Sequence, residues 1–281
     1  MIGLKHIGLC ADDFGLKPEI NEAVVQLVDA GVITAVSCMS TAPAWLSGAQ
    51  GLRGLRRAKV DVGVHINLTE VQAADPGHLR MPLAQVIACS LLHLLSGRAL
   101  HQAIHQQLST FEDAFQEPPD FVDGHQHVHQ LPQVRDALMQ CLAQRYPQHR
   151  PWLRCTRASR VLPIPFKQRV IAQLGAATWM RRALQRGYPM NRHLLGVYGF
   201  DADLPRYTAL LATWLEACQN GDLLTLHPAV PSATHPRGGR DPIAVARVVE
   251  YQALRRDGPQ LLSHYGVTPV RLSRHPEWLR H

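Results

Sequence analysis

The chain has 281 residues, a net charge of +7 and a hydrophobic share of 46%. This composition excludes a disordered, collagen-like or coiled-coil protein, because it is apolar enough to form a sizeable buried core. The basic residues are scattered and no nucleic-acid-binding motif occurs, so we expect no specific nucleic-acid partner.

The six cysteines are widely spaced, and none forms a Cys-x-x-Cys pair. This spacing predicts free, buried thiols in a reducing compartment. The first residues lack the apolar core of a signal peptide, and no apolar run is long enough for a transmembrane helix. We therefore expect a cytoplasmic protein, and the sequence leaves a homo-oligomer open.

Short apolar segments alternate with helical segments along the chain. The first apolar segment leads into two aspartates, and Pro18 and Gly31 mark the ends of the first helix. A loop is expected over 69–82, and a long basic amphipathic helix over 166–186. Strands are predicted over 6–11, 33–39, 60–67, 120–124, 152–155, 194–198 and 223–226, and helices over 18–30, 44–58, 83–95, 99–116, 132–145, 166–186, 204–219 and 241–256.

This alternation predicts an α/β fold with a parallel sheet. About seven strands with polar residues at their carboxyl ends favour a closed or nearly closed barrel, in which active sites lie at that end. We expect one domain over 1–281, with a barrel core over about 4–260 and a tail over 261–281. The alternative is an open doubly wound sheet, which usually carries a glycine-rich loop where this chain has two aspartates.

Polar residues follow four of the predicted strands, and parallel strands would bring them to one cavity. A carboxylate with two imidazoles is a common set of metal ligands. Adjacent residues of a regular strand point to opposite sides, so one aspartate could bind a metal while the other takes a proton. The residues at the four strand ends are Asp12 with Asp13, His65, His125 and His227.

Each of these positions also has a structural interpretation. An Asp-Asp pair after a strand often caps a helix, and a lone histidine such as His65 or His227 is more often packed or on the surface. His125, His127 and His129 alternate with period two, so we expect them to share one face of an extended strand. Their joint occurrence with Asp123 favours a metal site.

Four motifs carry a family resemblance. They are Cys-Ala-Asp-Asp-Phe-Gly-Leu over 10–16, Gly-Val-His-Ile-Asn-Leu-Thr over 63–69, Asp-Gly-His-Gln-His-Val-His over 123–129 and Leu-His-Pro over 226–228. The order and spacing of these motifs resemble those of the YdjC-like carbohydrate deacetylases. The resemblance extends from about residue 4 to residue 230. That family includes chitooligosaccharide deacetylases and hopanoid-associated deacetylases.

The resemblance implies a distorted TIM-like barrel that binds one divalent metal ion, magnesium or zinc, with manganese and cobalt as alternatives. It implies a hydrolase that removes the acetyl group from an N-acetylated sugar and releases acetate and an amino sugar. By motif position, Asp13, His65 and His125 match the metal ligands, Asp12 the general base and His227 a general acid, whereas His127, His129 and Asp123 line or support the site.

Several motif positions depart from the family pattern, which leaves the substrate open between an oligosaccharide and a lipid-linked glycan. Cys10, Gly124, Gln126 and Ala229 replace the family's usual Asn, Ser, His and Gly. The alternatives to a sugar deacetylase are a metal-dependent amidohydrolase acting on a non-sugar amide and a non-catalytic sugar-binding protein.

Two further segments bear on the substrate. The apolar stretch over 81–95 and the basic helix over 166–186 are expected either to pack on the barrel with a solvated face, or to contact an anionic membrane surface. The second interpretation would place the protein peripherally at the inner membrane face and would suit a lipid-linked sugar.

Overall fold

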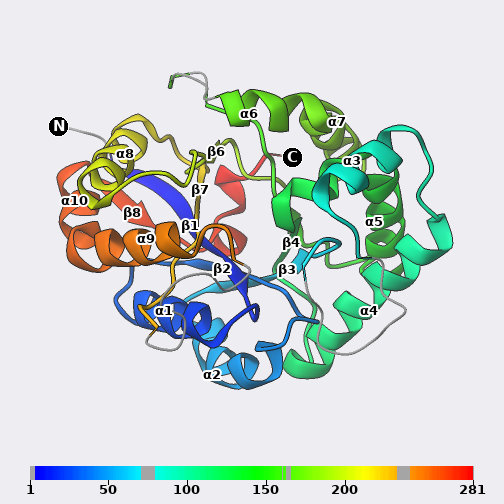
Figure 1. The fold of residues 1–281 in the computed structure, drawn as a ribbon, viewed down its shortest axis with the longest axis horizontal. Coiled ribbons are helices and arrows are strands. Elements are labelled where there is room, and N and C mark those ends of the chain that lie inside the picture. Colours follow the sequence, from blue (N-terminus) through cyan, green and yellow to red (C-terminus); the bar gives the residue numbers. More distant parts are fainter. Residues whose placement is uncertain (1–3, 71–79, 160, 163–165, 233–240, 281) are drawn as a thin grey trace.

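A computed structural model describes residues 4–70, 80–159, 161–162, 166–232 and 241–280. In this part of the chain, parallel strands form a curled sheet with helices around its outside (Figure 1). Neighbouring strands follow the order β5-β4-β3-β2-β1-β7-β6, and β8 pairs with the other end of β1. The strands are β1 (Lys5–Phe14), β2 (Ala35–Cys38), β3 (Asp61–Ile66), β4 (Phe121–Gly124), β5 (Trp152–Leu153), β6 (Leu194–Leu195), β7 (Leu223–Leu226) and β8 (Val267–Pro269).

The predicted α/β architecture, a distorted TIM-like barrel, is confirmed. The two edge strands β5 and β6 are shorter than predicted, but single bridges link each of them to the segment that flanks the other. Leu153 bridges to Met190 and Ala158 to Leu194, each in the parallel sense. The backbone N–H of Leu153 donates to the carbonyl of Pro189 at 2.8 Å. The sheet is therefore almost closed, which an open doubly wound sheet would not be.

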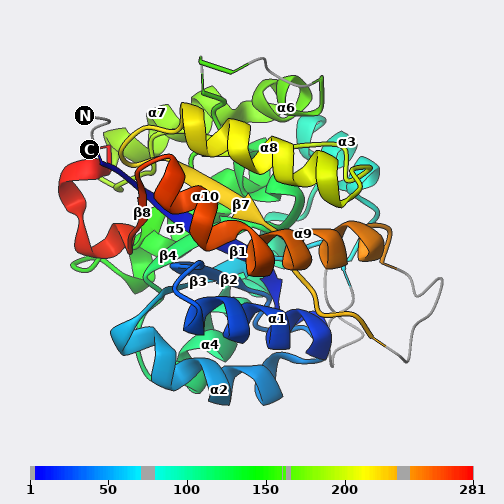
Figure 2. The same ribbon diagram turned by 90° about the vertical axis from the view of Figure 1, so that its left-hand side faces the viewer.

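The helices cover the outer face of the sheet (Figure 2). Proline stands in the first turn of α1, α5, α8 and α10, where its missing N–H has no helical partner to lose. No described helix is both long and apolar enough to cross a membrane. The helices are α1 (Pro18–Asp29), α2 (Trp45–Ala58), α3 (Leu83–Leu91), α4 (Gly97–Phe115), α5 (Pro132–Arg145), α6 (Phe166–Ile171), α7 (Ala177–Gln185), α8 (Leu204–Ala217), α9 (Ala244–Arg256) and α10 (Gly258–His264).

The core lies between the strands and the inner faces of these helices. All four residues of β2, β4 and β7 are buried, as the apolar runs of the sequence predicted for strands covered on both faces. All six cysteines are free, and only Cys89 is partly exposed, which agrees with the predicted buried thiols.

The prediction of one continuous helix over 166–186 is wrong. A π-helical turn, Ala172–Ala176, separates α6 from α7. Within it, Gly175 has a φ of 120°, and a Cβ at this position would lie 2.6 Å from the carbonyl oxygen of Gln130. The break lets the backbone approach Gln130 closely, and periodicity alone does not reveal such a contact.

Residues beyond 260 also take part in the sheet. The strand β8 pairs in parallel with the start of β1, with Lys5 opposite Val267. Near the end of the described chain, Met190 forms an antiparallel bridge with Arg280. A three-residue strand that ends in proline is too short to give a recognisable pattern.

Candidate active site

A cavity of about 720 Å³ opens at the carboxyl ends of the strands. Asp12, Asp13, His65, His125 and His227 all line it, so the structure brings together the five residues that the sequence placed at strand ends. His127 lines the cavity as well, whereas Asp123 and His129 are fully buried.

Asp12 and Asp13 both face this cavity, although they are adjacent in β1. The expectation that they point to opposite sides is wrong because β1 is irregular here. Its register against β2 shifts between Ala11 and Phe14, and Asp13 has a φ of 67°. This bulge turns the second carboxylate toward the same space as the first.

The histidine cluster does not form an extended strand with three residues on one face. Residues His125–Gln130 form a tight 3₁₀ turn, and Gln126 and His127 have φ values of 52° and 60°. His125 and His127 face the cavity, whereas the ring of His129 packs against Trp179 with 5.3 Å between centroids. Burial holds the pKa of His127 well below its usual value and lowers that of His129 to about 4, so both rings are neutral.

Three side chains converge on one point with ligand atoms for a cation. Oδ1 of Asp13 lies 3.4 Å from Nε2 of His65 and 2.9 Å from Nδ1 of His125. The other ring nitrogen of His65, Nδ1, lies 2.6 Å from Oδ1 of Asp123. A histidine held in this way by a carboxylate directs its free nitrogen to a metal. The donor set therefore fits a divalent cation, and all three ligand atoms lie within 4.8 Å of one another.

The carboxylates around this donor set favour a positive charge, which is a proton on His65 when no metal is bound. Burial lowers the pKa of His65, but Asp123 and Asp12 outweigh it and raise that pKa to about 10. Burial raises the pKa of Asp13, but Arg247 and His125 outweigh it and hold the carboxyl ionised. Nη2 of Arg247 donates to Oδ2 of Asp13 at 2.6 Å, which leaves Oδ1 for the cation.

Arg154 is a site residue that the sequence analysis missed. Its two terminal nitrogens donate to the two oxygens of Asp12, at 2.6 Å each, and Nη2 also lies 2.5 Å from Oδ2 of Asp123. Burial raises the pKa of Asp12, but Arg154 outweighs it and holds the pKa well below its usual value. Thr225 donates a further hydrogen bond to Asp12 at 2.8 Å. The available signal was an arginine inside the apolar strand predicted over 152–155.

His227 lies between two carboxylates. Its Nε2 is 3.9 Å from Oδ2 of Asp12, and its Nδ1 is 3.7 Å from Oε1 of Glu250. Glu250 is buried, accepts the backbone N–H of His227 at 2.5 Å and accepts the hydroxyl of Tyr198 at 2.8 Å. Glu250 and Tyr198 were not singled out in the sequence, because Glu250 lies within a helix with no motif around it. Glu250 therefore holds the backbone at His227 and places a negative charge near the ring, and Tyr198 orients Glu250.

One side of the cavity is apolar. This apolar wall comprises Leu83 and Ile87 of α3, Phe166 and Val170 of α6, and Leu174 of the π turn. The exposed fraction of Phe166 is 82% and that of Val170 is 39%, so the wall continues to the surface. A wall of this kind accommodates an apolar group beside the polar cavity floor.

The sequence pattern of the YdjC-like protein family matches residues 6–262. The chain is 28% identical to a carbohydrate deacetylase of Homo sapiens, over 82% of this chain and 76% of that protein. It is also 28% identical to a chitooligosaccharide deacetylase of Serratia marcescens, over 44% of this chain and 50% of that protein. A solved structure from Enterococcus faecalis, provisionally assigned to cellobiose-phosphate cleavage, has the same fold: its TM-score is 0.68 at 17% identity, over 97% of this chain and 99% of that one.

Proposed function

Because this chain belongs to the YdjC-like protein family, we propose that it is a hydrolase that removes the acetyl group from an N-acetylated sugar and releases acetate and an amino sugar. The observation that carries this proposal is the set Asp12, Asp13, His65, His125 and His227 in one cavity. The activity named for the human and Serratia relatives supports it.

We assign the metal site to Asp13, His65 and His125, with one divalent cation. Two imidazoles with one carboxylate suit zinc, whereas magnesium, manganese and cobalt would fill the remaining positions with water. When bound, such a cation polarises a carbonyl group and lowers the pKa of a water molecule toward neutrality. Asp123 supports the site through its contact with Nδ1 of His65.

The chain's own groups then move the protons. Asp12, ionised and oriented by Arg154, accepts the proton of the water that attacks the acetyl carbonyl. When the C–N bond breaks, Nε2 of His227 gives a proton to the departing nitrogen, which leaves as the amine. Glu250, oriented by Tyr198, holds the backbone of His227 and places a negative charge 3.7 Å from Nδ1 of the ring, which favours its protonated form. His127 presents a neutral ring to the substrate, and His129 supports the turn from behind.

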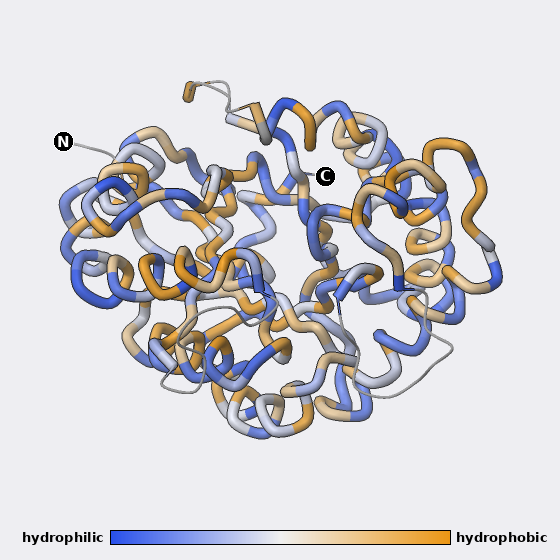
Figure 3. The backbone as a smooth tube through the Cα atoms, in the orientation of Figure 1, coloured by the Kyte–Doolittle hydropathy of each residue, from blue (hydrophilic) through white to orange (hydrophobic). Residues whose placement is uncertain are grey.

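The apolar wall favours a lipid-linked sugar over a plain oligosaccharide. A sugar placed with its acetyl group at the cavity floor would direct its aglycone along Ile87 and Val170. The turn after α3 is hydrophobic on the outside of the molecule (Figure 3), with Leu92 and Leu94 exposed at 68% and 69%. These leucines would suit a peripheral contact with a membrane, on its inner face for a cytoplasmic protein.

Acetate release tests the proposed activity. The purified protein is stripped of metal, supplied with each of the four cations in turn, and assayed with short chitin oligomers and with N-acetylglucosamine on a lipid carrier. Metal-dependent release that is lost in His125→Ala is the expected result. A protein that binds metal but releases acetate from no sugar would instead be an amidohydrolase for another amide, or a sugar-binding protein.

A second comparison tests the lipid-linked substrate. Octyl and methyl glycosides of N-acetylglucosamine are compared in the wild type and in Ile87→Ser, with Leu46→Ser as the control because Leu46 is 77% exposed and does not line the cavity. We expect a lower KM for the octyl glycoside, and we expect Ile87→Ser alone to remove this preference. Equal KM values for both glycosides in the wild type would contradict lipid recognition without affecting the deacetylase assignment.

A further inference from the structure

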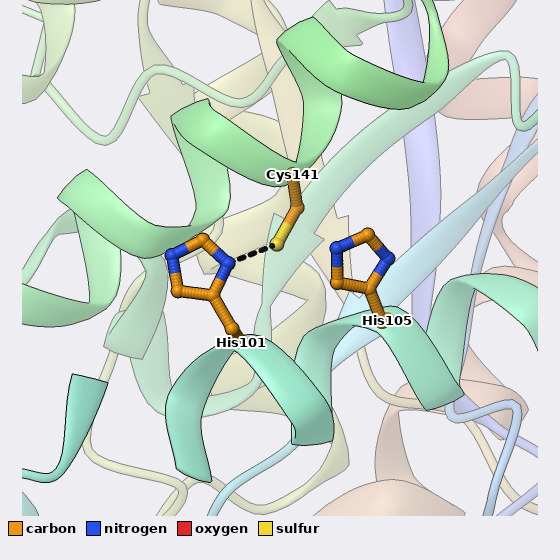
Figure 4. Close-up of side chains that lie close together, drawn as sticks. All are labelled: His101, His105 and Cys141. Atoms are coloured by element: carbon orange, nitrogen blue, oxygen red, sulfur yellow. Dashed lines mark hydrogen bonds between the residues drawn. The ribbon is translucent and has the colours of Figure 1, made fainter. Parts of the chain in front are cut away.

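A second group of side chains that could ligate a metal lies away from the cavity, between α4 and α5 (Figure 4). His101 and His105 are one helical turn apart on α4, so their rings project from the same face. Cys141 faces them from α5 and is fully buried, whereas both histidines are partly exposed. The proposed deacetylase mechanism uses none of these three residues.

The three ligand atoms have a spacing that suits a small cation. They lie within 4.8 Å of one another, and Sγ of Cys141 is 3.3 Å from Nδ1 of His101. In a tetrahedral zinc site, bonds of about 2.0–2.3 Å place neighbouring ligand atoms roughly 3.5 Å apart. One ring nitrogen of His105 points toward the sulfur, so a cation between the three side chains requires only small movements (Figure 4).

We propose that His101, His105 and Cys141 form a second metal site, which binds zinc or a similar borderline cation and links α4 to α5. Thiolate and imidazole are the ligands that such cations prefer, whereas magnesium and calcium prefer oxygen. Water would complete the coordination at the exposed side. On binding, the thiol of Cys141 loses its proton to solvent and the sulfur becomes a ligand.

Arg145 is the group that opposes this site. Its Nη1 lies 3.2 Å from Nδ1 of His105, and its positive charge would repel the cation. The guanidinium also contacts Glu112 and donates to Ser109 at 3.1 Å, so it keeps partners when it releases His105. His105 must then carry its proton on Nδ1 and present Nε2 to the metal. The site therefore predicts that replacing Arg145 by a neutral acceptor strengthens metal binding.

Cobalt(II) provides a direct test, because a thiolate bound to cobalt gives a near-ultraviolet charge-transfer band and a site of Asp and His ligands does not. The metal-free full-length protein is titrated with Co²⁺. We expect the band in the wild type and in Asp13→Asn, which lacks a ligand of the cavity site. We expect it to disappear in Cys141→Ser and to weaken in His101→Gln.

Cys10 is the matched control, because it lies beside Asp12 and Asp123 and is, among the residues that the structure describes, the other thiol in a group that could ligate a metal. Its sulfur accepts a hydrogen bond from Nη2 of Arg154 at 3.1 Å. The positive guanidinium group therefore already occupies that cluster. Cys10→Ser should keep the band. A band that is kept in Cys141→Ser, or no band in the wild type, would overturn the proposal.

Arg145→Gln provides an independent readout that does not depend on losing a ligand. Removing the guanidinium should lower the apparent Kd for Co²⁺ by about tenfold or more, since it removes the repulsion of a nearby charge. Circular dichroism verifies that each variant is folded. Unchanged or weaker binding in folded Arg145→Gln would contradict the proposed position of the cation beside His105.

Discussion

The guanidinium of Arg154 meets the carboxylate of Asp12 side by side, with 2.6 Å between each of the two nitrogen–oxygen pairs. The same guanidinium pairs with Asp123, whose other oxygen holds His65. One buried guanidinium group therefore connects the proposed general base, Asp12, with the carboxylate that holds the proposed metal ligand His65. The position of the base relative to the metal depends on a residue that lies in none of the sequence motifs.

Replacing Arg154 by methionine should strongly destabilise the protein. It would leave two buried carboxylates, Asp12 and Asp123, without their counter-charge, and breaking a buried ion pair by removing one partner costs about 3–5 kcal/mol. Urea unfolding of the metal-loaded protein measures this loss. The double variant Arg154→Met/Asp12→Asn should recover part of the lost unfolding free energy, because it removes one of the two unpaired charges. A loss below about 1 kcal/mol in the single variant would show that Arg154 does not stabilise the two carboxylates as described.

Asp12→Asn should lower kcat by at least about a hundredfold while the protein keeps its metal. Asparagine retains the shape of the side chain but cannot take a proton from water. Acetate release and elemental analysis of the same preparation measure the two properties. Asp13→Asn is the matched control, because it should lose the metal of the cavity site as well as activity. Full activity in Asp12→Asn would remove Asp12 from the mechanism.

Glu250→Gln should lower kcat by about 10- to 100-fold with little change in KM. Glutamine can still accept the N–H of His227, but it removes the negative charge 3.7 Å from Nδ1 of that ring. Steady-state kinetics on the best substrate of the panel give both constants. Tyr198→Phe should have a smaller effect, since it removes only one hydrogen bond to Glu250. An increase in KM alone would assign Glu250 to substrate binding instead.

His129 should make the protein less stable in acid. Burial lowers its pKa to about 4 in the folded state, against about 6.5 in the unfolded chain, so the unfolded state binds the proton first as the pH falls. Between those two values the protein should lose up to about 3 kcal/mol of unfolding free energy through this residue. Above pH 7 the contribution vanishes, because the ring is neutral in both states.

Urea unfolding at several pH values, with a chelator present, measures this contribution. His129→Gln lacks the titrating ring, so the stability difference between the variant and the wild type should shift in favour of the variant as the pH falls from 7 to 4. Parallel stability curves for the two proteins would mean that His129 is protonated as easily in the folded protein as in the unfolded chain.

The sequence by itself determined the architecture and the location of the candidate site. Apolar segments of strand length alternated with helical segments, and this order allows a parallel sheet with helices outside it. Because the ends of parallel strands meet at one edge, Asp12, His65, His125 and His227 could be placed together without knowing any contact between them. Local pattern was sufficient because each of these residues lies near the carboxyl end of a strand or directly after it.

Tertiary structure decided what each of these residues faces. The bulge at Asp13 and the left-handed turn at Gln126 and His127 depend on how the backbone packs against neighbouring segments, and period-two reasoning gave the wrong orientation at both places. Arg154 and Glu250 reach the site from positions 142 residues beyond Asp12 and 23 residues beyond His227. A buried charge is stable only where an oppositely charged or hydrogen-bonding partner lies beside it. Long-range packing, and not local sequence pattern, brings the two partners together.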